Sequence, residues 1–161
     1  MSMKSKPKPA KKETRGSLVK KSHGLMREIV LDRDGGCVCP RPERGHTPVR
    51  QAGHLIKSTK GKVRFDLWNV HEQCSACNGR HVRYEHYYVG WFIEKFGKDE
   101  YLRLTSEADG VGLKTYELQE LLVQFKAVRE KQLTRQLVGE TWKPYFTQQE
   151  ILSGAWREKQ A

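Results

Sequence analysis

The chain has 161 residues, which suits one domain of ordinary size with a short extension. Thirty Lys and Arg residues against nineteen Asp and Glu residues give a formal net charge of +11. No apolar run approaches the roughly 20 residues needed to span a bilayer, and the N-terminus lacks the apolar segment of a secretory signal. Four cysteines are too few for a disulfide-rich secreted scaffold. We therefore expect a soluble, basic protein of the cytoplasm, without a membrane partner, whose paired thiols favour a metal.

The beginning of the chain is unusually basic. Residues 1–21 contain eight cations and a single anion, Glu13, so they carry +7 of the net charge. Two prolines and the near absence of apolar residues before Leu18 leave little apolar surface to offset the entropy of ordering. We expect residues 1–16 to form a disordered arm that contacts phosphates, with Lys11 and Lys12 among its cations. A solvated, solubilising tail is the alternative.

Apolar periodicity predicts a helix over 18–33, which Gly35 and Gly36 end. A loop over 37–48, a strand over 49–56 and a basic loop over 57–64 follow, and residues 65–73 are expected to be partly extended. An aromatic helical face then predicts a helix that Gly97 closes, and its periodicity favours core packing over a base-stacking platform. A short helix over 99–108, a long helix capped by Thr115 and a last helix opened by Thr147 complete the chain.

Two thiol pairs enclose the middle of the chain: Cys37 with Cys39, and Cys74 with Cys77. Zinc in structural sites takes four tetrahedral nitrogen or sulfur ligands, and cysteine pairs on tight turns supply them two at a time. The second pair has the common C-x-x-C spacing, whereas the first pair is one residue shorter. We predict a structural Zn²⁺ bound by the four cysteines, with His46 as the alternative to either Cys37 or Cys39.

Three polar residues follow one another between and directly behind these pairs, in the order His54, Asn69 and Asn78. None is informative alone, because a lone His is more often structural than catalytic and a lone Asn is typical of turns. Their joint order, clamped by the two thiol pairs, indicates a site.

This arrangement resembles the HNH group of ββα-metal nucleases, and within it the phage recombination endonuclease family called NinG or Rap. The resemblance is carried by QAGHLI at 51–56, RFD at 64–66 and NVHEQCSACN at 69–78, and it extends more weakly over 18–137. It implies an α+β, mostly helical fold, in which residues 17–138 form a zinc-stapled HNH core with flanking helices. Residues 139–161 would be a C-terminal extension with a short helix.

The resemblance also implies a role for each residue. His54 matches the general base, Asn69 the residue that holds the loop and the base, and Asn78 a ligand of a catalytic divalent ion. Gln51 falls where an Asp ligand is frequent, and its neutral amide would bind the ion more weakly. A neutral imidazole suits removal of a proton from water, and Mg²⁺ or Mn²⁺ offsets charge on the leaving oxygen.

We therefore expect a phage endonuclease that acts in the infected bacterial host. The resemblance implies branched recombination intermediates, such as D-loops and Holliday junctions, as substrates. Basic residues of the 57–64 loop would contact phosphates, which set affinity without reading sequence: Lys57, Lys60, Lys62 and Arg64. A four-way junction has two-fold symmetry, so a homodimer is natural, with the 115–137 helix either at its interface or packed within the chain. The alternatives are a non-catalytic zinc-stapled DNA-binding module and an HNH nuclease for restriction or packaging of duplex DNA.

Overall fold

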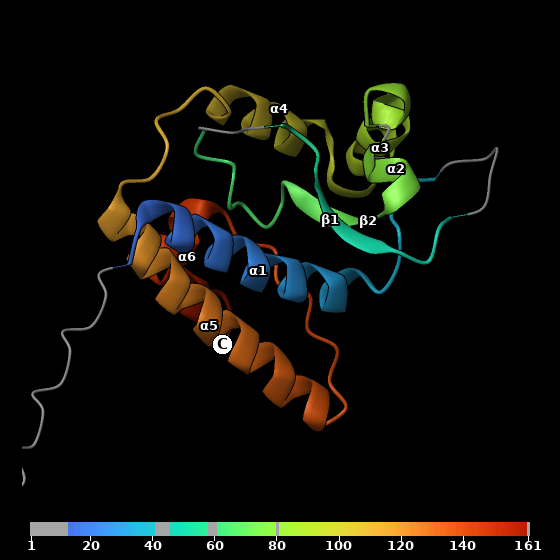
Figure 1. Ribbon diagram of the computed structural model, residues 1–161. Coiled ribbons are helices and arrows are strands. Elements are labelled where there is room, and N and C mark those ends of the chain that lie inside the picture. The colour runs from blue at the N-terminus through green and yellow to red at the C-terminus, as the bar shows by residue number, and fades with distance from the viewer. Residues whose placement is uncertain (1–12, 41–45, 58–60, 80, 161) are drawn as a thin grey trace, which may run out of the picture.

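The computed structural model describes residues 13–40, 46–57, 61–79 and 81–160. The expectations for Lys11, Lys12, Lys60 and most of the basic arm lie outside these residues. Within them the fold is α+β and mostly helical, as predicted, with a small two-stranded sheet (Figure 1). The elements follow in the order α1 (Arg15–Asp34), β1 (Arg50–His54), β2 (Val70–Cys74), α2 (Ser75–Gly79), α3 (His81–Phe96), α4 (Lys98–Glu107), α5 (Thr115–Leu137), α6 (Gln148–Ser153) and the 3-10 helix η1 (Ala155–Gln160).

Helix α1 begins at Arg15, earlier than the apolar spacing predicted. The reason is a cap, because the Thr14 hydroxyl accepts a hydrogen bond from the Ser17 backbone N–H at 3.2 Å. The helix ends as predicted at Gly35, whose φ of 67° lies in the left-handed region that favours glycine. Residues 15 and 16 of the segment expected to be disordered are therefore helical.

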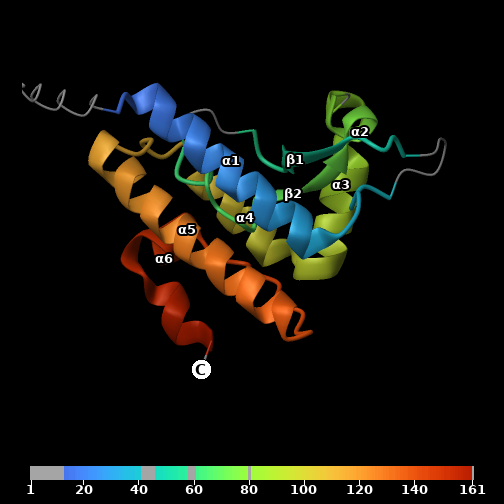
Figure 2. The same cartoon turned by 60° about the horizontal axis from the view of Figure 1, so that its bottom comes forward.

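The larger core lies between α1 and α5, which run side by side in Figure 1 and in the turned view of Figure 2. The apolar face predicted over 115–137 packs within the chain, with Phe125 fully buried, although Leu133 is 44% exposed. The N-cap of α5 is Lys114 rather than the predicted Thr115. Helix α6 and η1 pack against the α5 side of the molecule and complete this core. Of the two roles expected for this face, intramolecular packing is the one observed.

The sheet lies between α1 and the aromatic helix α3. Strands β1 and β2 are antiparallel, with Gln51 opposite Gln73 and Gly53 opposite His71. The His71 ring contacts the Tyr88 ring of α3, so these alternate positions face α3. The intervening side chains face α1. The aromatic face of α3 is buried in a second core, which confirms the core-packing interpretation.

A buried ion pair joins α1 to the sheet and to the C-terminal segment. The Arg33 side chain is fully buried and lies 2.7 Å from the Asp34 carboxylate. Asp34 in turn accepts the backbone N–H of Glu72 in β2 at 2.8 Å. The guanidinium also donates to three backbone carbonyl oxygens, those of Leu67, Val70 and Pro144. Arg33 thus fixes the chain on both sides of Asn69 to the end of α1.

We predict that Arg33→Leu lowers the free energy of unfolding by about 3–5 kcal/mol, because it leaves a buried carboxylate and three carbonyl groups without their partner. Urea titration monitored by circular dichroism measures this loss. Arg135→Ala is the control, since its ion pair with Glu140 is partly exposed and should contribute at most about 1 kcal/mol. Equal losses in the two variants would contradict the role given to Arg33.

Candidate functional site

Four potential metal ligands converge beside the end of β2. The ligand atoms of Cys37, His46, Cys74 and Cys77 all lie within 4.8 Å of one another. His46 Nδ1 lies 3.7 Å from the Cys74 sulfur and 3.8 Å from the Cys77 sulfur. The segment of Cys37 is tied to β2 by the Val38 N–H, which donates to the Glu72 carbonyl at 2.9 Å. Three thiols and one imidazole are a donor set that fits structural zinc.

His46 takes the place that the sequence favoured for Cys39. Cys39 is buried next to the cluster but is not among the four converging ligands. The C-x-C spacing lacks the additional residue with which C-x-x-C turns both of its sulfur atoms toward one point. Of the first pair, only Cys37 therefore lies in the cluster. His46 provides the fourth candidate ligand.

The electrostatics of the three thiols favour a cation among them. Burial raises the pKa values of Cys37 and Cys77, and at Cys77 neighbouring thiols add to the effect. Burial acts in the same direction at Cys74. Hydrogen bonds from the backbone of Cys77 and Thr47 and from the His46 ring outweigh it and lower the pKa of Cys74 to about 5. A dication would stabilise all three thiolates, since metal binding displaces their protons.

We predict about one zinc per chain, retained in Cys39→Ser but lost or strongly weakened in Cys74→Ser and in His46→Ala. Elemental analysis of the purified variants gives the stoichiometry, and thermal unfolding reports the coupled loss of stability. Loss of zinc in Cys39→Ser with retention in His46→Ala would instead establish the four-cysteine site.

His54 stands at the end of β1 with its ring half-buried. Its Nε2 lies 2.9 Å from the backbone carbonyl oxygen of Arg64. Because a carbonyl oxygen only accepts, Nε2 carries a hydrogen, and in the neutral form of the ring the lone pair is on Nδ1. The ring of His23 in α1 approaches it edge-on, with 5.8 Å between centroids. The fold thus selects one tautomer of His54.

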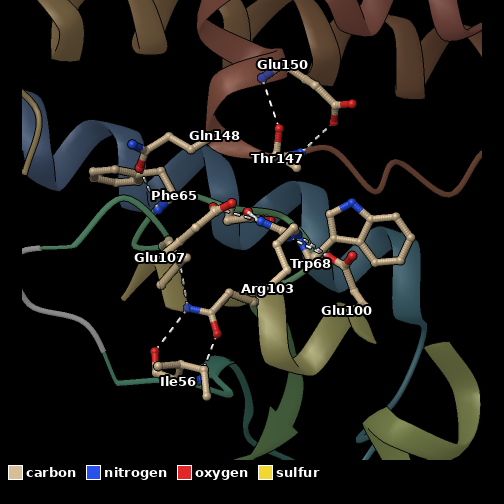
Figure 3. A network of polar contacts seen from close by, with 12 residues as sticks. Ile56, Phe65, Trp68, Glu100, Arg103, Glu107, Thr147, Gln148 and Glu150 are labelled. Carbon is tan, nitrogen blue, oxygen red and sulfur yellow. Dashed lines mark hydrogen bonds and ion pairs between the residues drawn. The ribbon is translucent and has the colours of Figure 1, made fainter. Parts of the chain in front are cut away.

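Asn69 is completely buried and closes the loop that follows His54. Its Nδ2 donates to the carbonyl oxygens of Ile56 and Val63, both at 3.0 Å. Its Oδ1 accepts the Ile56 N–H at 2.7 Å, so Ile56 is held by both of its backbone groups (Figure 3). This loop leads on to Arg64, whose carbonyl orients His54. The geometry is that of a residue that holds the loop.

The turn into Asn69 has its own support. The buried Asp66 accepts the Trp68 backbone N–H at 2.8 Å, and its backbone carbonyl accepts the Asn69 N–H at 3.0 Å. Arg103 of α4 donates to Asp66 at 3.1 Å and bonds as well to Glu100 and Glu107 on its own helix (Figure 3). Helix α4 is thereby anchored to the loop.

Asn78 and Gln51 are brought together, but not as two equivalent ligands. Asn78 Nδ2 donates to Gln51 Oε1 at 2.8 Å. The oxygen of Gln51 that was expected to bind metal therefore accepts a hydrogen bond that orients the Asn78 amide. The other end of that amide, Oδ1, faces Gly53, where an added Cβ would lie 2.9 Å away. Gln73, for which the sequence indicated no role, reaches the same place from β2.

A family model described as Bacteriophage Lambda NinG protein matches residues 2–136, most of the chain and the whole of this site. The chain belongs to the phage lambda NinG family. A search of curated proteins and a search of solved structures returned no match. The matched range includes the basic N-terminal segment. None of the helices in the described part of this NinG-family chain is long and apolar enough to cross a membrane.

The expected phosphate contacts of the NinG-family chain differ in their surroundings. Lys57 and Lys62 are exposed, as a DNA contact requires. Arg64 is half-buried, and its Nε donates to His23 Nε2 at 3.0 Å. Arg64 and Arg15 both line a pocket of about 260 Å³. Sequence spacing did not predict that His23 or Arg15 would lie beside Arg64, because no local pattern links α1 with the 57–64 loop.

The His23 ring accepts a hydrogen bond from Arg64 and is therefore neutral in the fold. This predicts that the stability of the protein depends on pH. Burial, Arg64 and His54 lower the pKa of His23 to about 4, from an ordinary value near 6.5 in the unfolded chain. Between these values the unfolded state binds more protons, so His23 makes the fold less stable as pH falls. Burial of Asp66, partly offset by Arg103, raises its pKa to about 7 and acts in the opposite direction.

Comparison with His23→Gln isolates the histidine, because Asp66 is common to both proteins. We predict that the loss of unfolding free energy between pH 7 and pH 5 is smaller in His23→Gln than in the wild type. Urea titrations at the two pH values measure it. Parallel losses in both proteins would show that His23 is protonated as readily in the folded state as in the unfolded state.

Proposed function

We propose that this NinG-family chain is a divalent-metal-dependent DNA endonuclease that prefers branched recombination intermediates. The observation that supports it best is the arrangement around β1. On the α1 side, His54 is held in a single tautomer by the Arg64 carbonyl. On the α3 side, the Asn78 amide oxygen faces Gly53. A base and an oxygen ligand thus flank one strand.

His54 would act as the general base. Its Nδ1 takes the proton of a water that attacks phosphorus, and the bond from Nε2 to the Arg64 carbonyl then stabilises the imidazolium. Asn69 keeps that carbonyl in place because its amide fixes the loop at Ile56 and Val63. No positioning step is needed at the moment of reaction, which is the condition for efficient proton transfer.

Asn78 would hold the divalent ion on the other side of the strand. When bound, Mg²⁺ or Mn²⁺ supplies positive charge next to the leaving oxygen. The donor chemistry fits, because Mg²⁺ keeps most of its waters and needs only one or two protein oxygens. In-line displacement places the attacking and leaving oxygens on opposite sides of phosphorus. For His54 and Asn78 to serve one phosphate, both must reach it beyond the end of β1, where Gly53 and His54 are adjacent residues.

Zinc would serve this site indirectly. Asn78 directly follows Cys77, so a zinc bound in the Cys37, His46, Cys74 and Cys77 cluster fixes the start of α2 against β2. The basic arm and the exposed lysines would contact phosphates on the substrate. The preference for branched DNA rests on the family resemblance. A homodimer would match the two-fold symmetry of a four-way junction.

The test of the proposal is cleavage of labelled branched and linear DNA with and without Mg²⁺ or Mn²⁺. We predict metal-dependent cleavage of the branched substrates, reduced ~10²–10⁴-fold in His54→Ala while DNA binding changes by no more than a few-fold. His86→Ala, an exposed histidine on α3, is the matched control and should cleave like the wild type.

Binding without cleavage under every metal condition would favour the non-catalytic DNA-binding module. Equal cleavage of linear duplex DNA would favour a restriction or packaging nuclease. Wild-type rates in His54→Ala would remove His54 as the base.

Deletion of residues 1–12 tests the basic arm without removing the Thr14 cap of α1. We predict weaker DNA binding and a salt dependence whose slope falls by roughly one unit for each phosphate that the arm neutralises, with Lys11 and Lys12 contributing. Fluorescence anisotropy over a salt series measures this slope. An unchanged slope would make the segment a solubilising tail.

A further inference from the structure

Gln73 of β2 presents an amide oxygen that the fold leaves without a partner. Its side chain is 1% exposed, and its Oε1 makes no hydrogen bond among the described residues. Leaving a buried polar atom unsatisfied destabilises the fold, and such atoms in native proteins frequently mark a site for an ion, a water or a ligand. In the antiparallel register, Gln73 lies directly opposite Gln51 and diagonal to Gly53.

The space over Gly53 is where this oxygen points. A Cβ at position 53 would lie 2.0 Å from Gln73 Oε1 and 2.9 Å from Asn78 Oδ1. Gly53 does not have a positive φ, so its backbone conformation does not require glycine. A side chain at position 53 would displace Gln73 Oε1, so glycine here leaves a space that two amide oxygens from different elements share.

The surroundings orient both oxygens toward that room. Gln51 Oε1 accepts the Asn78 Nδ2–H at 2.8 Å, which turns Asn78 Oδ1 away from Gln51 and toward Gly53. The Tyr88 hydroxyl donates to the Gly53 carbonyl at 3.1 Å and fixes the strand beneath them. Amide oxygens brought together in this way are ligands for a hard cation, and a cation would satisfy the buried oxygen of Gln73.

We propose that Gln73 Oε1 and Asn78 Oδ1 together bind the divalent cation, and that Gln51 positions the Asn78 amide without itself being a ligand. The inference rests on the proposed function for the identity of the ion, and it assigns Gln73 as the second protein ligand. The site is built from neutral oxygens only, so the protein supplies geometry, and the phosphate of the substrate supplies the negative charge.

Mn²⁺ binding to the zinc-loaded, full-length chain, followed by electron paramagnetic resonance of free Mn²⁺ in the absence of DNA, tests this proposal. Gln73→Leu keeps the volume but removes the oxygen and should weaken binding by at least ~10-fold, because even partners outside the coordination shell contribute ~10–100-fold. Gln73→Glu adds charge at the same place and should tighten binding. Gly53→Ala places a methyl group in the shared space and should weaken binding as Gln73→Leu does.

Gln119→Leu, an exposed glutamine on α5, is the control and should bind Mn²⁺ like the wild type. Zinc content and thermal unfolding establish that each variant is folded. Equal Mn²⁺ affinities in wild type, Gln73→Leu and Gln73→Glu would overturn the inference, and so would the absence of Mn²⁺ binding to the wild type. If cleavage depends on metal but the Gln73 variants bind Mn²⁺ like the wild type, this inference is wrong and the proposed function stands. Gln73-dependent Mn²⁺ binding without cleavage defeats the proposed function alone.

Discussion

The buried guanidinium of Arg33 is the interaction on which the rest of the structure depends. A two-stranded sheet is marginal on its own, and here both strands are short. Arg33 donates to the carbonyl oxygens of Leu67 and Val70, on either side of Asn69, while its neighbour Asp34 accepts a backbone N–H of β2. One turn at the end of α1 therefore determines where β2 begins and where Asn69 lies. The same guanidinium reaches Pro144 and so ties in the C-terminal segment.

Directly after the segment that Arg33 anchors, one short stretch of chain contributes residues to both candidate metal centres. Strand β2 carries Gln73 and Cys74, and α2 carries Cys77 and Asn78, so consecutive residues point to different centres. The candidate zinc ligands are thiols and an imidazole, soft donors that suit a permanently bound ion. The oxygens near Gly53 are neutral amides, hard donors that suit a divalent ion held less tightly than zinc. A chain with net charge +11 attracts the phosphates that would complete such a site.

Much of this arrangement could be predicted from the sequence. Periodicity located α1, α3 and α5 because each buries an apolar face, and the capping box at Thr147 located α6. The order of His54, Asn69 and Asn78 indicated a site, and the structure gives Asn69 the loop-holding bonds expected of it. These features depend on local pattern, and local pattern is what a sequence displays directly.

The rest depends on register and tertiary contact. Spacing alone could not decide between Cys39 and His46, because the answer depends on where the loop after residue 40 returns. The proximity of His23 to Arg64 requires α1 to cross the 57–64 loop. The family resemblance implied that Gln51 is a metal ligand. Its partner across the sheet, Gln73, has the amide oxygen that is left unsatisfied. A glutamine beside a cysteine carries no signal until the strands are paired.

The role of His54 as a base opposite a bound cation is tested most directly by the pH dependence of single-turnover cleavage. With a saturating four-way junction and Mn²⁺, we predict a rate that falls in first order with proton concentration on the acid side, as the His54 imidazole is protonated. In His54→Ala the decline of the rate at low pH should disappear, and the rate itself should be ~10²–10⁴-fold lower. Cleavage that needs no divalent ion, or an unchanged decline at low pH and an unchanged rate in His54→Ala, would contradict this role.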